Sequence, residues 1–145
     1  MMIAISSCLV GKPCRYNATD SLNQALVDSI GNDDYIDICP ELLAGLSVPR
    51  LPCEIVGGEG KCALAGNAKM INSAGDDITE KVLRGAQLAL DICRRKNVTK
   101  AYLKQNSPTC GSGKIYDGTF TNTLMEGDGV FAALLKEHGI NVIAV

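Results

Sequence analysis

The residues that most readily suggest chemistry are cysteines, and one of them lies in an unusual segment. The stretch "KQNSPTCGS" at 104–112 follows an apolar run, has neither helical nor strand periodicity, and holds Cys110 in a turn. A free cysteine usually behaves as a small buried apolar residue. Either this thiol is a buried packing residue, or the turn keeps it accessible for a chemical role.

Three cysteines share this setting. Cys8 follows a first apolar run, Cys39 ends a second within "CPE", and Cys110 follows a later one within "SPTCG". Loops that leave the C-terminal ends of parallel strands line one crevice, which is where open α/β sheets bind ligands. We therefore expect these three thiols to converge. Cys14, in "GKPCRY", belongs to the same first loop as Cys8 and is a further candidate.

The other cysteines are interpreted differently. Cys93 falls on the apolar face of a predicted helix and is assigned to the core, whereas Cys53 and Cys62 lie in a segment without clear periodicity and receive no role. The total of seven cysteines is odd, which does not favour a disulfide framework. The first residues carry no positive charge ahead of the apolar run, so we predict a strand there and expect a reducing, cytoplasmic location.

Metal binding is the chemistry that several convergent thiols suggest. Structural zinc sites usually show C-x-x-C or paired histidine spacing, but this chain has no C-x-x-C and one histidine, His138. His138 is at a predicted helix end, where a cation suits the helix dipole. Thiolates from separate loops can instead hold an iron–sulfur cluster. With three ligands one iron would stay open, as catalytic metal sites require.

The elements that must position these thiols alternate along the chain. Thr19 and Asp20 suggest the start of the first helix, Asp76, Asp77 and Thr79 that of the long one, and Asp128 a cap for the last. We predict strands at 2–7, 35–39, 99–105 and 140–145, helices within 19–31, 76–98 and 126–139, a helical turn at 41–46, and a hairpin around Gly66 and Asn67.

Strands that alternate with helices predict an α/β fold with a mainly parallel sheet and helices on both faces. The length of 145 residues suits one domain, and no repeat or linker divides the chain, so we expect a single domain over 1–145. No run approaches the roughly 18 apolar residues of a membrane span. The net charge of −2 and the scarcity of aromatic residues argue against nucleic acid as a partner.

Several motifs, taken together and in order, resemble a known family. They are "SSCLVGKPCRY" near the start, "CPELLAGLSVPR" at 39–50, "LRGA" at 83–86, "SPTCG" at 107–111 and "IYDGTFTNTLMEGDGV" at 115–130. The chain is similar along nearly its whole length to the domain-of-unknown-function 523 family (DUF523), whose characterised members include bacterial 2-thiouracil desulfidases.

The resemblance implies a Rossmann-like α/β domain with a 4Fe-4S cluster held by three cysteines. At matching positions these would be Cys8, Cys39 and Cys110, with Cys14 as the alternative to Cys8. The open iron would take the sulfur of a small thiolated substrate, such as a thiolated pyrimidine, and water would replace that sulfur without net redox change.

Two further residues receive hypothetical catalytic roles. Glu41, close to Cys39, could activate the attacking water as general base, and Ser107, close to Cys110, could bind the substrate or position that water. Each also has a purely structural interpretation, because a carboxylate suits a helix N-terminus and a serine hydroxyl suits a turn.

Three other interpretations remain open from the sequence, and one of them is a structural α/β protein whose thiols are incidental. A carrier of a cluster or metal, without turnover, would use four protein ligands, with Cys14 completing the set. A metal-free thiol enzyme would use Cys110 as nucleophile and would need a base near that thiol.

Overall fold

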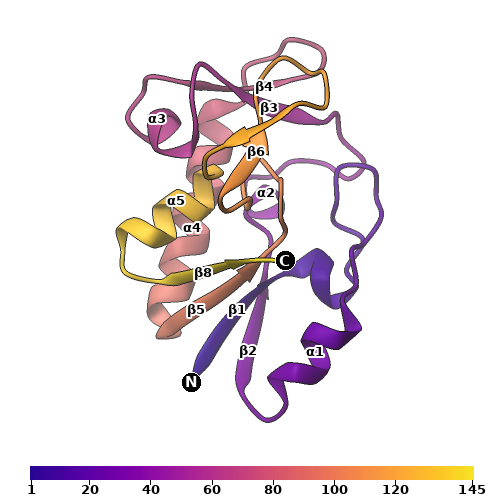
Figure 1. The fold of residues 1–145 in the computed structure, drawn as a ribbon, viewed down its shortest axis with the longest axis vertical. Coiled ribbons are helices and arrows are strands. Elements are labelled where there is room, and N and C mark those ends of the chain that lie inside the picture. Colours follow the sequence, from indigo (N-terminus) through magenta and orange to yellow (C-terminus); the bar gives the residue numbers. More distant parts are fainter.

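The centre of the molecule is a four-stranded parallel sheet. The computed structural model describes residues 1–145, and its central strands follow the order β2-β1-β5-β8 (Figure 1). Their bounds are β1 (Met2–Ser6), β2 (Asp34–Ile38), β5 (Val98–Leu103) and β8 (Asn141–Ala144). The four predicted strands and the α/β class are therefore confirmed.

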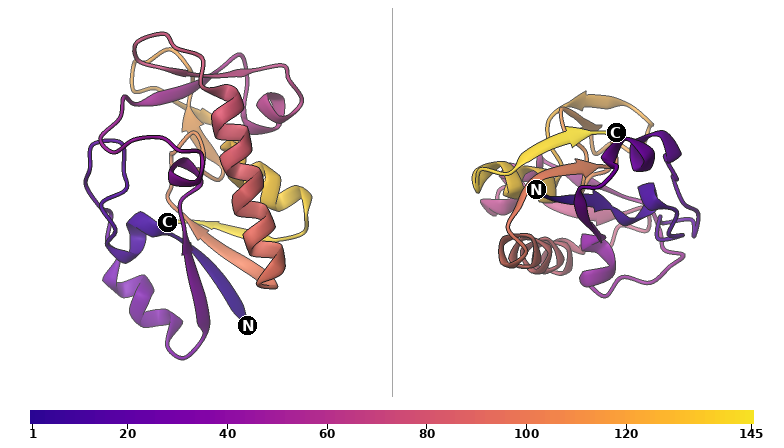
Figure 2. Two further views of the ribbon diagram at one scale, coloured as in Figure 1. Left: turned by 180° about the vertical axis from the view of Figure 1, so that it is seen from behind. Right: turned by 90° about the horizontal axis from the view of Figure 1, so that it is seen from below.

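Helices cover both faces of this sheet, as predicted. Ile3 and Ile5 of β1 point to one face, where they pack with α1 (Gln24–Ile30), while Ala4 points to the other. The second face carries α4 (Thr79–Arg95) and α5 (Val130–Glu137), and the views in Figure 2 show α4 and α1 on opposite sides of the strands. No helix combines the length and apolar character that crossing a bilayer would require.

The long helix α4 follows its sequence pattern closely. The residues expected on its apolar face are all fully or almost fully buried: Val82, Ala86, Ala89, Leu90 and Cys93. Their spacing places them on one stripe, which packs against the sheet and α5. The assignment of Cys93 to the core is therefore confirmed.

The first helix begins later than predicted. It starts at Gln24, and the Asn23 side chain accepts a hydrogen bond from the Leu26 N–H (3.0 Å) as the N-cap. Before it, Asn17 accepts from the Thr19 N–H (3.3 Å) and Asp20 accepts from the Leu22 N–H (2.9 Å). Such local side-chain bonds stabilise turns in competition with a helix.

The predicted cap of the last helix is also wrong. Gly129 is the N-cap of α5 and provides no side chain, whereas the Asp128 carboxylate accepts from the Gly113 N–H (2.9 Å) and pairs with Lys136 (2.9 Å). A side chain at Gly129 would come within 2.6 Å of the Thr109 backbone. Asp128 is therefore used to join the segment after Cys110 to α5.

Two antiparallel hairpins stand beside the central sheet. The first pairs β3 (Cys53–Val56) with β4 (Lys69–Asn72). The predicted hairpin around Gly66 and Asn67 is wrong, because the residues before this turn form the helix α3 (Gly60–Leu64) and β4 pairs with β3 instead. The second pairs β6 (Lys114–Tyr116) with β7 (Leu124–Glu126) and was not predicted.

A short helix, α2 (Pro40–Leu43), packs directly on α4 at Gly85. A Cβ at Gly85 would clash with the Pro40 carbonyl and approach the Ala44 Cβ within 2.7 Å. We expect Gly85→Ala to lower the free energy of unfolding by about 1–3 kcal/mol through overpacking, despite the better helix propensity of alanine. Denaturant unfolding measures this change. Lys81→Ala, at an exposed position of the same helix, is the control, and equal stabilities of the two variants would contradict the prediction.

Candidate functional site

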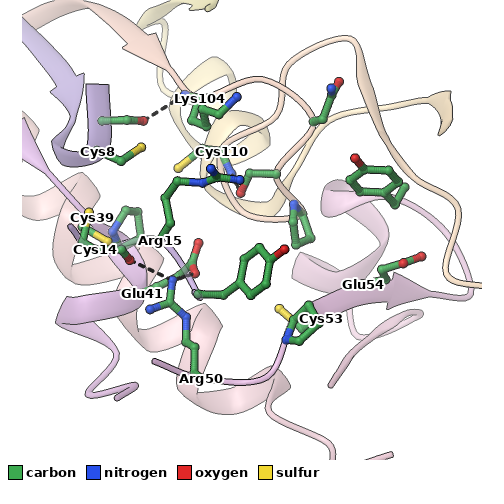
Figure 3. A pocket seen from close by; sticks show the side chains of 18 of the residues that line it. Cys8, Cys14, Arg15, Cys39, Glu41, Arg50, Cys53, Glu54, Lys104 and Cys110 are labelled. Atoms are coloured by element: carbon green, nitrogen blue, oxygen red, sulfur yellow. Dashed lines mark hydrogen bonds and ion pairs between the residues drawn. The ribbon is translucent and has the colours of Figure 1, made fainter. Parts of the chain in front are cut away.

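The structure brings together the three cysteines that follow strands. Cys8 lies in the short 3₁₀ helix η1 (Ser7–Val10) directly after β1, Cys39 comes directly after β2 as the N-cap of α2, and Cys110 lies in the loop after β5. All three line one cavity with a volume of about 510 Å³ (Figure 3). The expected convergence at the carboxyl edge of the sheet is therefore observed.

Two more cysteines face this cavity. Cys14 lines it beside Cys8 and Cys39 and is within hydrogen-bonding reach of both, and Cys53 lines it from β3 (Figure 3). All seven cysteines are free thiols. Sequence reasoning gave Cys53 no role, because its segment has no periodicity that would place it.

The thiols are arranged for a group larger than one ion. No set of three His, Cys, Asp or Glu side chains lies close enough to hold a single metal ion. The strand-end thiols instead stand around a shared space, and their charges influence one another's ionisation. Thiolate ligands favour iron–sulfur clusters among metal groups, and a four-iron cluster needs ligands further apart than one ion does. The donor set therefore fits a cluster.

The environment of these thiols shifts their pKa values in different directions. A hydrogen bond from Cys14 lowers the pKa of Cys8, with Lys104 contributing, although burial opposes the shift. The hydrogen bond with Cys14, together with burial, raises the pKa of Cys39 well above its usual range. Burial also raises the pKa of Cys110. Because metal ligation requires thiolates, metal binding here must release protons.

Cys14 lies between two of these thiols. Its hydrogen bond with Cys39 lowers its pKa, but the bond to Cys8 and burial outweigh that effect and raise the pKa of Cys14 to about 11. Cys14 is therefore protonated at neutral pH and donates to Cys8.

Two serine hydroxyls fix the edge of the sheet below the thiols. The Lys104 N–H donates to the Ser6 Oγ (3.0 Å), and the Ser7 hydroxyl donates to the Asp37 Oδ2 (2.7 Å). These bonds connect the end of β1 to β5 on one side and to β2 on the other. Both serines are buried, so these hydrogen bonds are shielded from water.

Ser107 shapes the turn that carries Cys110. Its Oγ accepts from the N–H groups of Thr109 and Cys110, both at 3.1 Å. The Gly111 N–H donates to the Ser107 carbonyl (2.7 Å), and a Cβ at Gly111 would come within 2.6 Å of that oxygen. The turn-forming interpretation of Ser107 is therefore correct. Because the hydroxyl also lines the cavity and donates to no protein group, its proton is available there.

Glu41 lies in the first turn of α2 and forms an ion pair with Arg50, largely shielded from solvent. The Arg50 guanidinium also donates to the Cys14 carbonyl (3.1 Å), and its backbone N–H donates to the Tyr16 carbonyl (2.7 Å). Arg50 thus ties the first cysteine loop to Glu41. Sequence reasoning gave it no role, because its partners are remote in sequence.

Two further cations line the cavity without an acidic partner. Arg15 comes from the first loop and Lys104 follows β5, and neither forms an ion pair. Figure 3 shows both side chains in the same cavity as Cys110. Each leaves a positive charge near the thiols, which favours an anionic group in this space.

The hydrogen bond between Cys14 and Cys8 leads to a testable prediction about the pKa of Cys8 in the reduced, metal-free protein. Cys14→Ala removes the donor that stabilises the Cys8 thiolate, so the pKa of Cys8 should rise. Alkylation of Cys8 by iodoacetamide, followed by mass spectrometry across a pH series, should then reach its half-maximal rate at higher pH. Cys62→Ala, outside the cavity, is the control, and an unchanged Cys8 profile in Cys14→Ala would contradict this account.

Comparison with known proteins gives consistent results. Residues 3–145 match the family model described as 2-thiouracil desulfurase. The chain is 44% identical over 143 residues to the uncharacterized protein YbbK of Bacillus subtilis (strain 168), covering 99% of this chain and 95% of that one. A solved structure of the 4Fe-4S-dependent thiouracil desulfidase TudS superposes with a TM-score of 0.85 at 36% identity, covering 99% of this chain and 89% of that one.

Proposed function

The chain belongs to the 2-thiouracil desulfurase family, as its motifs indicated, and from this premise we propose that it removes sulfur from a small thiocarbonyl compound with a 4Fe-4S cluster. A thiolated pyrimidine is the substrate class that the family suggests. The observation that carries the proposal is the convergence of three strand-end cysteines on one cavity. Its volume of about 510 Å³ is within the usual range for small-molecule sites.

We propose Cys8, Cys39 and Cys110 as the cluster ligands. Cys8 and Cys39 closely follow two neighbouring parallel strands, and Cys110 lies in the loop after a third, so all three stand at the carboxyl edge of the sheet. Cys14 is the alternative to Cys8, because it lines the same cavity. The unpaired positive charges of Arg15 and Lys104 favour a cluster in this cavity, since a cluster held by thiolates places negative charge beside them.

When bound, the cluster would supply an open iron with affinity for the substrate's sulfur. The chain's own residues then handle water and protons. Glu41 accepts a proton from the water that attacks the thiocarbonyl carbon, and Arg50 orients its carboxylate. Water's oxygen replaces sulfur, which leaves as hydrogen sulfide, and no electrons are gained or lost. The proton that Glu41 accepts and the second proton of the water leave with the sulfur, and Ser107 donates a hydrogen bond to the substrate without losing its proton.

A carrier function has one observation in its favour. Cys14 reaches both Cys8 and Cys39, so a fourth thiol is available to close the ligand set. A cluster with four protein ligands would leave no iron open for substrate. The number of cysteines that the cluster requires therefore separates the two functions.

We expect serine substitution of Cys8, Cys39 or Cys110 to abolish cluster uptake, and Cys14→Ser to retain it. The protein is reconstituted anaerobically with iron and sulfide, and iron content, visible absorbance and sulfide release from 2-thiouracil are measured. Cys62→Ser is the control because this thiol lies outside the cavity. A requirement for Cys14 in addition to Cys8, Cys39 and Cys110 would favour the carrier, and failure of the unmodified protein to take up iron would refute the cluster.

Replacing Glu41 tests the proposed base separately from the cluster. Glu41→Gln keeps the shape of the side chain but removes its basicity, so sulfide release should fall by about a hundredfold or more while iron content and absorbance persist. Glu80→Gln is a matched control, since Glu80 also lies in the first turn of a helix but outside the cavity. An unchanged rate in Glu41→Gln would remove Glu41 from the mechanism.

A further inference from the structure

The loop that joins β6 to β7 forms a wall of the cavity and has no part in the function proposed above. It spans 117–123, and its residues Phe120 and Asn122 line the same cavity as the thiols. Phe120 is 39% exposed, so it is not part of the core. The chain has only two phenylalanines, and one of them lines this cavity.

The backbone of this loop is held in an unfavourable conformation. Phe120 has φ +58° and Asn122 has φ +57°, and Asn106, which lines the cavity from another loop, has φ +66°. Positive φ is tolerated by asparagine but is a genuine outlier for a bulky residue such as phenylalanine. Such conformations persist only where surrounding contacts impose them, and they cluster at binding and catalytic sites.

A buried carboxylate imposes this conformation. Glu54 of β3 is only 8% exposed, and its Oε1 accepts from the N–H groups of Gly118 (2.9 Å) and Phe120 (3.2 Å). Gly118 lies so close to β3 that a Cβ there would be 2.5 Å from the Ile55 carbonyl oxygen. Figure 3 shows Glu54 beside Cys53 on β3. The backbone of Phe120 is thus fastened directly to the first hairpin.

The loop is further stiffened by its own side chains. The Asp117 carboxylate accepts from the Thr119 N–H (3.0 Å) and hydroxyl (2.6 Å). The hydroxyls of Thr119, Thr121 and Thr123 then form a chain of hydrogen bonds at 2.6 and 2.8 Å. The backbone that carries Phe120 is therefore preorganised, so a ligand that binds against this residue does not have to order the loop.

We propose that Phe120 is a specificity-determining residue whose ring stacks on the flat ring of a heteroaromatic thiocarbonyl substrate, and that Glu54 is the positioning residue that holds it. The inference rests on the proposed function. Offset stacking between aromatic rings contributes binding energy beyond apolar burial, and it is available to any planar heterocycle. A thioamide without a ring gains none of it, so the loop selects ring substrates over open-chain ones.

The absence of tryptophan from the chain allows a direct binding test. Phe120→Trp places a single tryptophan in the cavity of the reconstituted protein, and titration with 2-thiouracil should quench its fluorescence saturably. Tyr35→Trp, at an exposed position on β2, is the control for light absorption by the ligand. Equal quenching in the two variants would overturn the proposal.

Kinetics test the selectivity. Phe120→Leu should raise the KM for 2-thiouracil by about tenfold with little change in kcat. Phe120→Tyr keeps an aromatic ring and should have the KM of the unmodified protein. The KM for thioacetamide, an open-chain thioamide, should be the same in Phe120→Leu as in the unmodified protein. An unchanged KM for 2-thiouracil, or equal losses for both substrates, would refute the role of Phe120.

Glu54 variants separate positioning from general stability. Glu54→Gln keeps an oxygen that accepts the two N–H bonds and should leave KM unchanged, while Glu54→Leu should raise KM as Phe120→Leu does. Equal KM values in Glu54→Leu and the unmodified protein would contradict the positioning role. If the unmodified protein released no sulfide from either compound, the proposed function would fail. Saturable quenching in Phe120→Trp would in that case still support the stacking site, and a lack of such quenching would refute the stacking site.

Discussion

Ser6 pairs with Ile38, and Ile5 pairs with Tyr102, so β1, β2 and β5 end at the same level of the parallel sheet. The three chain segments that continue from these ends therefore all begin at the carboxyl edge of the sheet, side by side. This constraint comes from backbone hydrogen bonding and is independent of any bound group. It brings Cys8, Cys39 and Cys110 together although they are far apart in sequence.

The second half of the site comes from the antiparallel hairpins. The sheet edge supplies the strand-end thiols, whereas the hairpins supply Glu54, Phe120 and Cys53 from the β3 and β6–β7 side of the cavity. Figure 1 shows β3, β4 and β6 grouped together at one end of the molecule, away from the N-terminal ends of the central strands. The proposed division of work follows this architecture: the sheet positions the cluster ligands, and the hairpins shape the space for the substrate.

Local patterns predicted the parts of this structure that depend on local interactions. The apolar stripe of α4 and the strand ends were readable because periodicity reports which face is buried. The start of α1 was not, because the Asn17 and Asp20 side chains accept hydrogen bonds from nearby backbone N–H groups and favour a turn where the residue types suggested a helix. Asp128 has the chemistry of a cap but pairs with Lys136 and the Gly113 N–H instead.

The polar contacts that organise the cavity left no signal in the sequence. Arg50 meets the Cys14 carbonyl across 36 positions, and Glu54 meets the Phe120 N–H across 66. Such contacts follow no repeat in the sequence, because the two partners come together only when the chain has folded.

The contacts of Arg50 also bear on the two cysteines of the first loop. Cys8 leaves β1 directly, at the level where Cys39 leaves β2, so its position is set by the sheet. Cys14 comes later in the loop, and its carbonyl binds the same guanidinium that pairs with Glu41. A largely shielded ion pair is costly to break, because removing one partner leaves an uncompensated charge. The backbone of Cys14 thereby helps to hold the proposed base in place, while its thiol remains free to line the cavity.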